Sequence, residues 1–272
     1  MAETDLFLWD HPVSPFCQKV RIALREKNIP FQFSTPRGTG SGIASNMDSN
    51  FADRNPRLEV PTLVVDGGAV KIFDSTIILE YIEDAYPHSV PLRATSAVDR
   101  ARARMIEDVC DSQYEAANWG MGEITTFRRA ENHGDLAEKL KTKAAEHVGL
   151  IQAWLTQQLG DAPWFGGETF GYADVCVWPF VNRSSSYGLE PKPGTLLGDW
   201  YERAKQRPSV KSVFDEFLAN TKGMSVAYEA VQKGLLKRQY RDHRLEWMIK
   251  TGGMGIVKEG MEKDNIRFQW PS

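Results

Sequence analysis

The chain has 272 residues, with 42% hydrophobic and 25% charged side chains and a formal net charge of −3. This composition predicts a folded globular protein of one large or two moderate domains, and it gives no reason to expect nucleic acid as a partner. No apolar run reaches the roughly 20 residues of a membrane-spanning helix, so we expect no membrane partner. Three widely spaced cysteines and an acidic start without a signal-peptide pattern favour a cytoplasmic protein without disulfides.

The first recognisable elements are a strand and a helix joined by a short turn. Residues 6–9 predict the strand, and the helix begins at Pro15. Ser14 has the position of a helix N-cap, because proline is preferred at the first helical position and serine just before it. Cys17 follows in the first turn. Free backbone N–H groups and the helix dipole favour an anion there, so both side chains are candidate catalytic groups.

The next segments predict the rest of a small mixed domain. Residues 31–34 predict a second strand, and residues 35–54 are a long polar loop of a length that is often functional. Two apolar runs, 62–65 and 70–73, are separated by turn residues and predict a hairpin. A helix follows over 75–82, with Asp74 or Ser75 as its cap.

A change of composition near residue 90 predicts a domain boundary. Prolines interrupt the helical pattern after residue 86, and from residue 98 the pattern is helical with no strand signal. We expect helical segments at 98–129, 136–159, from 174 to 180, 196–206 and 209–218. The predicted organisation is an α/β domain at 1–86, a linker at 87–97, an all-α domain at 98–221 and a C-terminal extension at 222–272.

Three short motifs in this order resemble those of the cytosolic glutathione S-transferase family. They are the turn that ends in Ser14, the pair Val60-Pro61 before the third strand, and the pair Asp74-Ser75 at the start of the last helix of the α/β unit. The resemblance covers roughly residues 5–220 and is to the tau-, zeta- and omega-like classes. It implies a thioredoxin-like domain followed by a helical domain, glutathione as co-substrate, and a homodimer.

The resemblance also implies roles for these residues. Ser14 falls at the catalytic position, where a hydroxyl donates to the glutathione thiolate. The backbone of Val60, before a cis Pro61, would pair with the cysteinyl unit of the tripeptide. Asp74 and Ser75 would hold its γ-glutamyl end, with the Ser75 hydroxyl at the carboxylate and Asp74 near the ammonium group.

One position departs from the family pattern. Many relatives have Lys or Gln before the Val-Pro pair, whereas this chain has Glu59, which would repel the glycyl carboxylate of glutathione. Arg57, Arg54 or Arg37 would then supply the missing positive charge. In the helical domain, the family capping box reads Gly171-Tyr172-Ala173-Asp174, and we interpret it as a folding device.

Cys17 is the alternative reactive centre, because a thiolate at this turn would give glutathione-dependent thiol transfer or reduction. The competing interpretation is a buried, inert cysteine, which is also what we expect of Cys110 and Cys176 in their apolar helical stretches. His11 beside the turn is a possible ligand contact. The five histidines show no metal-ligand spacing, so we expect no metal.

The second substrate would lie between the domains, opposite Ser14. Tyr114, Met105 and Trp119 are candidate wall residues on the first long helix. The extension carries ten Lys/Arg and six Asp/Glu, with a helical pattern over 228–250 that ends at the glycines near 252. Its large apolar side chains predict packing on the body, over the substrate cleft or a dimer surface.

The leading hypothesis is a detoxifying glutathione transferase in which Ser14 stabilises the thiolate for attack on an apolar electrophile. The alternatives are a thiol transferase or reductase that acts through Cys17, and a glutathione-binding protein without catalytic activity. Fold alone does not decide among them.

Overall fold

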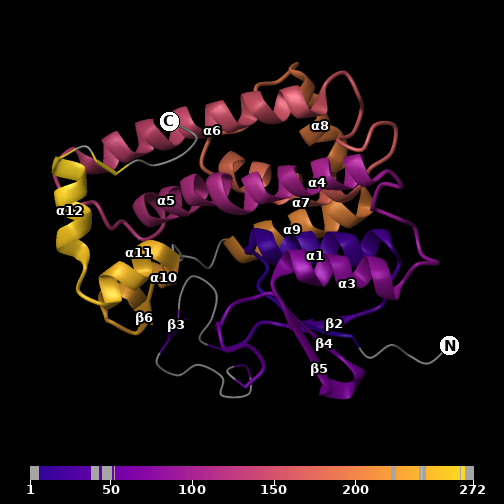
Figure 1. The fold of residues 1–272 in the computed structure, drawn as a ribbon, viewed down its shortest axis with the longest axis horizontal. Coiled ribbons are helices and arrows are strands. Elements are labelled where there is room, and N and C mark those ends of the chain that lie inside the picture. Colours follow the sequence, from indigo (N-terminus) through magenta and orange to yellow (C-terminus); the bar gives the residue numbers. More distant parts are fainter. Residues whose placement is uncertain are drawn as a thin grey trace.

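The computed structural model describes residues 6–37, 43–44, 51, 53–221, 225–238, 240, 243–263 and 265–266. The first part is a thioredoxin-like α/β domain, as expected, whose helices α1 and α3 lie on one face of a four-stranded sheet (Figure 1). The strand order is β2-β1-β4-β5, with β1 parallel to β2 and antiparallel to β4. The elements are β1 (Phe7–Trp9), α1 (Pro15–Glu26), β2 (Gln32–Ser34), β4 (Thr62–Val65), β5 (Val70–Phe73) and α3 (Ser75–Ala85).

The predicted hairpin over 62–73 is confirmed, and it contains the central buried strand. All four residues of β4 are buried, and β4 pairs with β5 across a 3₁₀ turn at Asp66–Gly68. Gly67 has φ +62°, a conformation that glycine adopts without steric cost. Most of the predicted loop over 35–54 lies outside the described residues, which include the short strand β3 (Ile43–Ala44).

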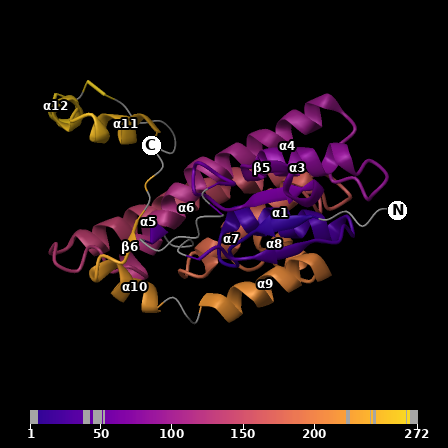
Figure 2. The same cartoon turned by 90° about the horizontal axis from the view of Figure 1, so that it is seen from below.

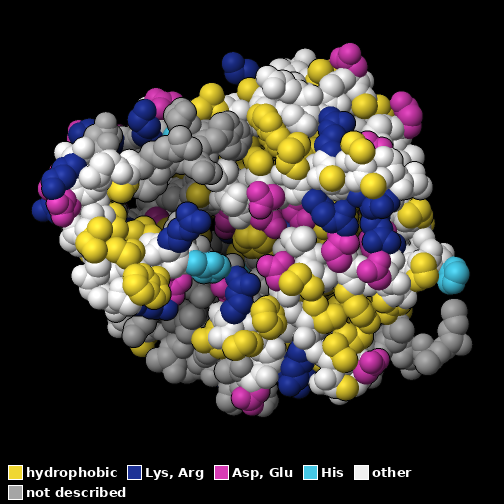
Figure 3. Space-filling view, in the orientation of Figure 1, with side chains coloured by type: hydrophobic (Ala, Val, Ile, Leu, Met, Phe, Trp, Pro, Cys, Tyr) yellow, Lys and Arg dark blue, Asp and Glu magenta, His cyan; other side chains and the backbone are white. Residues whose placement is uncertain are grey.

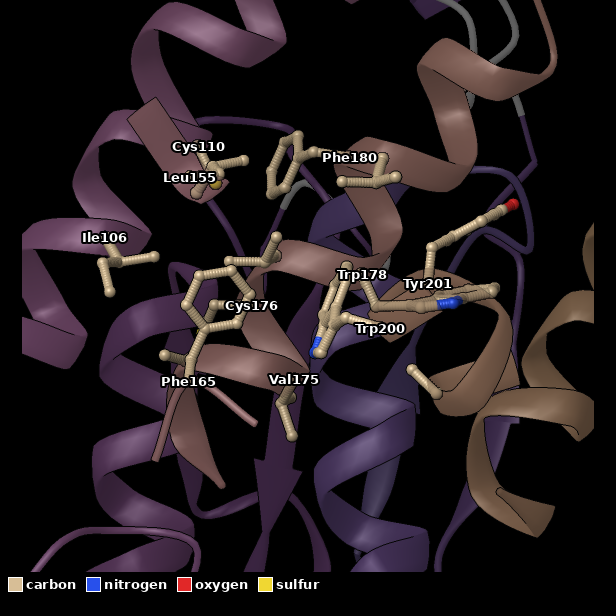
Figure 4. Packing of buried hydrophobic residues seen from close by; sticks show 14 of the residues in the cluster. Ile106, Cys110, Leu155, Phe165, Val175, Cys176, Trp178, Phe180, Trp200 and Tyr201 are labelled. Carbon is tan, nitrogen blue, oxygen red and sulfur yellow. The ribbon is translucent and has the colours of Figure 1, made fainter. Parts of the chain in front are cut away.

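The second part is the expected all-α domain. Its core is lined by buried side chains of α7, among them Cys176, Trp178 and Phe180, which pack with Trp200 of α8 (Figure 4). The helices are α4 (Ala97–Val109), α5 (Glu115–Thr125), α6 (Leu136–Leu159), α7 (Tyr172–Ser185), α8 (Leu196–Lys205) and α9 (Pro208–Thr221).

Asp174 stabilises the start of α7, as its place in the capping box predicts. Its buried carboxylate accepts hydrogen bonds from the backbone N–H groups of Gly171 and Phe165 and from the indole of Trp200. Burial raises the pKa of Asp174 to about 6, although these three donors favour the charged form.

The helical run over 98–129 differs from the prediction in one turn. Between α4 and α5 the chain winds as a π-helix over Cys110–Tyr114. A π-turn contains one more residue than an α-helical turn, so the side chains after it point in different directions from those of a continuous α-helix. Such turns are frequent at functional sites. As a result Cys110 and Tyr114 lie in the core, whereas Asp111 and Gln113 face the space between the domains.

The C-terminal extension is more broken than predicted. The helical pattern over 228–250 is divided into α10 (Ser225–Gln232), β6 (Leu236–Lys237) and α11 (His243–Lys250), followed by α12 (Met254–Glu262). Gly234, with φ +69°, follows the end of α10, and β6 pairs antiparallel with β3. Viewed from below, α11 and α12 stand away from the helical domain (Figure 2). Trp247 and Ile256 on them are more than half exposed, so the predicted packing on the body does not extend to these side chains.

In the described part of the chain, no helix is both long and apolar enough to cross a membrane.

Candidate functional site

A pocket with a volume of about 670 Å³ lies between the two domains. It is lined by the turn before α1, the segment before β4, the start of α3, the helices α5 and α7, and the residues after β6. Its mouth is part of the hollowed face in Figure 3, where cationic and histidine side chains gather. The N-termini of α1 and α3 both reach this pocket, so backbone N–H groups and two helix dipoles favour anions in it.

Ser14 lines the pocket as the N-cap of α1. Its Oγ accepts a hydrogen bond of 3.4 Å from the backbone N–H of Cys17, and its own N–H donates to His11 O. Because Oγ accepts from the helix N–H, the hydroxyl keeps its own proton, which it can donate to the Cys17 sulfur or to a group in the pocket. The side chain is half-buried and therefore accessible from this side.

Val60 and Pro61 also line the pocket, and the peptide bond between them is cis, as the resemblance implies. The preceding segment is held by Asn55, a buried residue that sequence reasoning missed. Its side-chain amide donates to Glu59 O at 2.6 Å and to Thr62 Oγ1 at 3.0 Å, while its oxygen accepts from the N–H of Arg57. The only sequence signal for this role was an asparagine before a proline in a polar loop.

Asp74 and Ser75 also line the pocket, at the start of α3. Asp74 is the N-cap and accepts from the backbone N–H groups of Thr76 and Ile77. It has φ +77°, a costly conformation for a residue with a side chain, and such strain is concentrated at functional sites. Ser75 is buried against the pocket.

Arg57 is the one of the three candidate arginines that lines the pocket. Its guanidinium lies 3.0 Å from the carboxylate of Glu59 and 4.0 Å from that of Asp74. Arg54 instead lies over the Trp9 ring, at 5.9 Å from the centroid, and Arg37 is exposed and outside the pocket lining. The negative charge of Glu59 is thus compensated within the chain, which reduces its repulsion of a carboxylate ligand.

Cys17 is fully buried and does not line the pocket. Its sulfur accepts a hydrogen bond of 3.3 Å from the backbone N–H of His11. Burial raises the pKa of the Cys17 thiol well above its ordinary value, and the nearby Asp10 raises it further. A protonated, inaccessible thiol is a poor nucleophile, so the geometry favours the structural interpretation. Cys110 and Cys176 are also fully buried and unpaired.

Only one of the three predicted wall residues lies in the pocket. Trp119 on α5 lines it. The prediction for Tyr114 is wrong, because the π-turn directs its ring into the core, where its hydroxyl is hydrogen-bonded with Ser184 at 2.8 Å. The prediction for Met105 is also wrong, because this side chain is half exposed on α4 and outside the pocket lining.

Several pocket residues were missed because they come from distant parts of the sequence. Arg183 and Tyr187 extend from the C-terminal end of α7, and Arg238, Tyr240 and His243 come from the extension. The extension was expected to cover either the substrate cleft or a dimer surface, and these three of its residues line the interdomain pocket. No group of side chains suited to a metal ion occurs among the described residues.

Comparison with known proteins gives a consistent result. The N-terminal domain family of glutathione S-transferases matches residues 8–90, and the corresponding C-terminal domain family matches residues 151–203. Glutathione S-transferase U22 of Arabidopsis thaliana is 26% identical over 223 residues, which cover 76% of this chain and 88% of the relative. Glutathione S-transferase GstB of Escherichia coli is 28% identical over 208 residues, with coverage of 76% and 96%. The structure is similar to that of rice GST1 solved in complex with glutathione, with a TM-score of 0.65, 24% identity and coverage of 84% and 98%.

Proposed function

Because the chain belongs to the cytosolic glutathione S-transferase family, we propose that it conjugates glutathione to an apolar electrophile, with Ser14 as the residue that stabilises the thiolate. The thiol of glutathione loses its proton to solvent, and the sulfur forms a bond to an electrophilic carbon. The leaving group departs with the electron pair of the broken bond. A thiol pKa lowered from about 8.5 toward neutrality makes this attack efficient at physiological pH.

The observation that carries the proposal is the position of the Ser14 hydroxyl. It lies at the positive end of α1, in the pocket, and its oxygen already accepts from the Cys17 N–H. It can therefore donate its proton to a sulfur anion placed beside it. The pair Asp74 and Ser75 at the second helix N-terminus then suits the γ-glutamyl group, and the backbone of Val60, a lining residue, suits the peptide.

The direct test is Ser14→Ala with 1-chloro-2,4-dinitrobenzene as the acceptor. Loss of one hydrogen-bond donor to a developing anion should lower kcat/KM by about 100-fold or more and raise the apparent pKa of the bound thiol. Glutathione affinity, measured by calorimetry, should change by less than about threefold, since the other contacts remain.

Ser112→Ala is the matched control, because Ser112 lines the same pocket but its hydroxyl donates to the carbonyl of Asp108. Its activity should equal that of the wild type. If Ser14→Ala keeps full activity, Ser14 is not the thiolate-stabilising residue. If Cys17 forms a mixed disulfide with glutathione, detected by mass spectrometry, the thiol-transferase alternative is correct. A folded chain that fails to bind immobilised glutathione would contradict the proposal altogether.

We also propose that the protein acts as a homodimer in the cytoplasm. Dimerisation is what the resemblance implies, and three buried, unpaired cysteines are compatible with a reducing compartment. Sedimentation velocity at micromolar concentration distinguishes the dimer from a monomer of 30.7 kDa.

A further inference from the structure

Arg183 is a charged side chain of the pocket for which the proposed mechanism has no use. It lies in the last turn of α7, is half-buried, and lines the space between the domains. Among the residues that the structure describes, no carboxylate forms an ion pair with its guanidinium. Holding a cation partly out of water without a partner is unfavourable, so the site favours an anionic ligand.

The other arginines of the pocket are already engaged. Arg57 is paired with Glu59, and Arg238 is paired with Glu123 on α5 at 2.5 Å. Two acidic residues of the lining are engaged elsewhere: Asp111 is bound on both oxygens by Lys19, and Asp74 caps α3.

Arg183 faces the reactive turn from the opposite domain. His11 and Ser14 of that turn line the same pocket as Arg183, and the charge of Arg183 adds to the burial that lowers the pKa of His11 to about 4. The residues proposed for glutathione lie on the α/β domain, whereas Arg183 lies on the helical domain with Trp119 and Tyr187. Arg183 therefore belongs to the half of the pocket that is left for the second substrate.

We propose that Arg183 is a specificity-determining residue that selects electrophiles carrying a carboxylate group on a flat apolar body. This inference rests on the proposed function and names its substrate class. A guanidinium matches the two oxygens of a carboxylate with parallel hydrogen bonds. Trp119 offers an aromatic wall to the body of the substrate. In the reaction, the sulfur–carbon bond forms, the carbon–halogen bond breaks, and halide leaves with the electron pair while the carboxylate stays on Arg183.

The test uses a matched pair of acceptors, 4-chloro-3-nitrobenzoate and 4-chloro-3-nitrobenzamide, each rate being divided by the uncatalysed rate with glutathione. Arg183→Met should lower kcat/KM for the benzoate by at least about 10-fold, the value of one lost hydrogen bond to a charged group. The kcat/KM for the benzamide should change by less than twofold. Arg183→Lys should retain part of the activity on the benzoate. Arg102→Met is the control, because Arg102 is exposed, lies outside the pocket lining and donates to the carbonyl of Gln158.

Three outcomes overturn the inference. An equal loss for both acceptors would mean that Arg183 acts on the thiolate, and a raised KM for glutathione alone would mean that it binds the tripeptide. Equal activity of the variant and the wild type on the benzoate would mean that it binds neither substrate.

Calorimetry with unreactive 3-nitrobenzoate separates this inference from the proposed function. Binding that depends on Arg183 supports the carboxylate site even if no acceptor is turned over. Turnover of the benzamide without any preference for the benzoate contradicts the carboxylate site but not the proposed function.

Discussion

His11 lines the pocket, and its protonation state affects the net charge there. Burial lowers its pKa to about 4, and the nearby cations Arg183 and Arg21 add to the effect. The imidazole is therefore neutral at physiological pH, and its Nδ1 accepts a hydrogen bond from the N–H of Val13. The turn before Ser14 keeps its shape without adding a second positive charge beside Arg183.

The depressed pKa of His11 predicts a stability change in acid. The pKa of His11 is about 6.5 in the unfolded chain and about 4 in the folded protein. Between these values the unfolded state binds a proton and the folded state does not, so the free energy of unfolding decreases as the pH falls from 6.5 to about 4. His11→Asn keeps an acceptor near the N–H of Val13 but does not titrate. The variant should therefore lose less stability than the wild type between pH 6.5 and 4, as measured by urea unfolding at each pH. Parallel losses in the two proteins would contradict this assignment.

Local chemistry explains why some site residues were predictable and others were not. Ser14 and Asp74 are helix caps, and a cap is recognisable from a few neighbouring residues. The sequence around Tyr114 also fits a residue that lines the pocket. A π-turn, for which the sequence gives no signal, directs its side chain into the core instead. The role of Arg183 had no local signal, because the absence of an ion-pair partner among the described residues depends on which carboxylates the fold brings near it.

Among the elements, the segment from β6 to Tyr240 fastens the extension over the pocket. Arg238 pairs with Glu123 on α5 and lies over the rings of Phe127 and Trp119. The Tyr240 hydroxyl donates to the same Glu123, and its ring packs edge-on against Trp119. The apolar pattern of the extension predicted docking, but the anchor is a buried ion pair whose two members are far apart in the sequence.

Glu123→Gln tests this anchor without altering the sequence of the extension. It leaves the Arg238 guanidinium buried without its counter-ion, which costs about 3–5 kcal/mol where a buried pair is broken. The extension should detach more often, so tryptic cleavage at Lys233 and Lys237 should accelerate by at least about 10-fold. Glu138→Gln, which breaks an exposed pair with Lys141, should leave the cleavage rate unchanged. Equal rates in all three proteins would show that the pair does not hold the extension.

At the scale of the whole molecule, the two domains are joined by buried charges as well as by apolar packing. Ile22 and Ala23 of α1 are part of the core of the helical domain. Lys19 of α1 reaches Glu107 at 2.7 Å and both oxygens of Asp111, and Tyr172 donates to the same Glu107. Burial alone would lower the pKa of Lys19, but the two carboxylates raise it, so the ammonium group stays charged.

Lys19→Met should destabilise the protein by about 3–5 kcal/mol, because two partly or fully buried carboxylates lose their counter-ion. Urea unfolding monitored by tryptophan fluorescence measures this loss. Lys141→Met, which removes an exposed cation, should change the free energy of unfolding by less than about 0.5 kcal/mol. A similar small change for Lys19→Met would mean that the network contributes little to joining the domains.

The pairing of β3 with β6 has a consequence for turnover. It connects the loop of the first domain to the extension, and the extension is fastened to α5 a few residues later. A thioether conjugate is bulkier than either molecule from which it forms, so its exit requires a wider passage than entry did. Arg238 and Tyr240 come after β6 and line the pocket, so we expect movement of this part of the extension, rather than bond formation, to limit the rate with the most reactive acceptors.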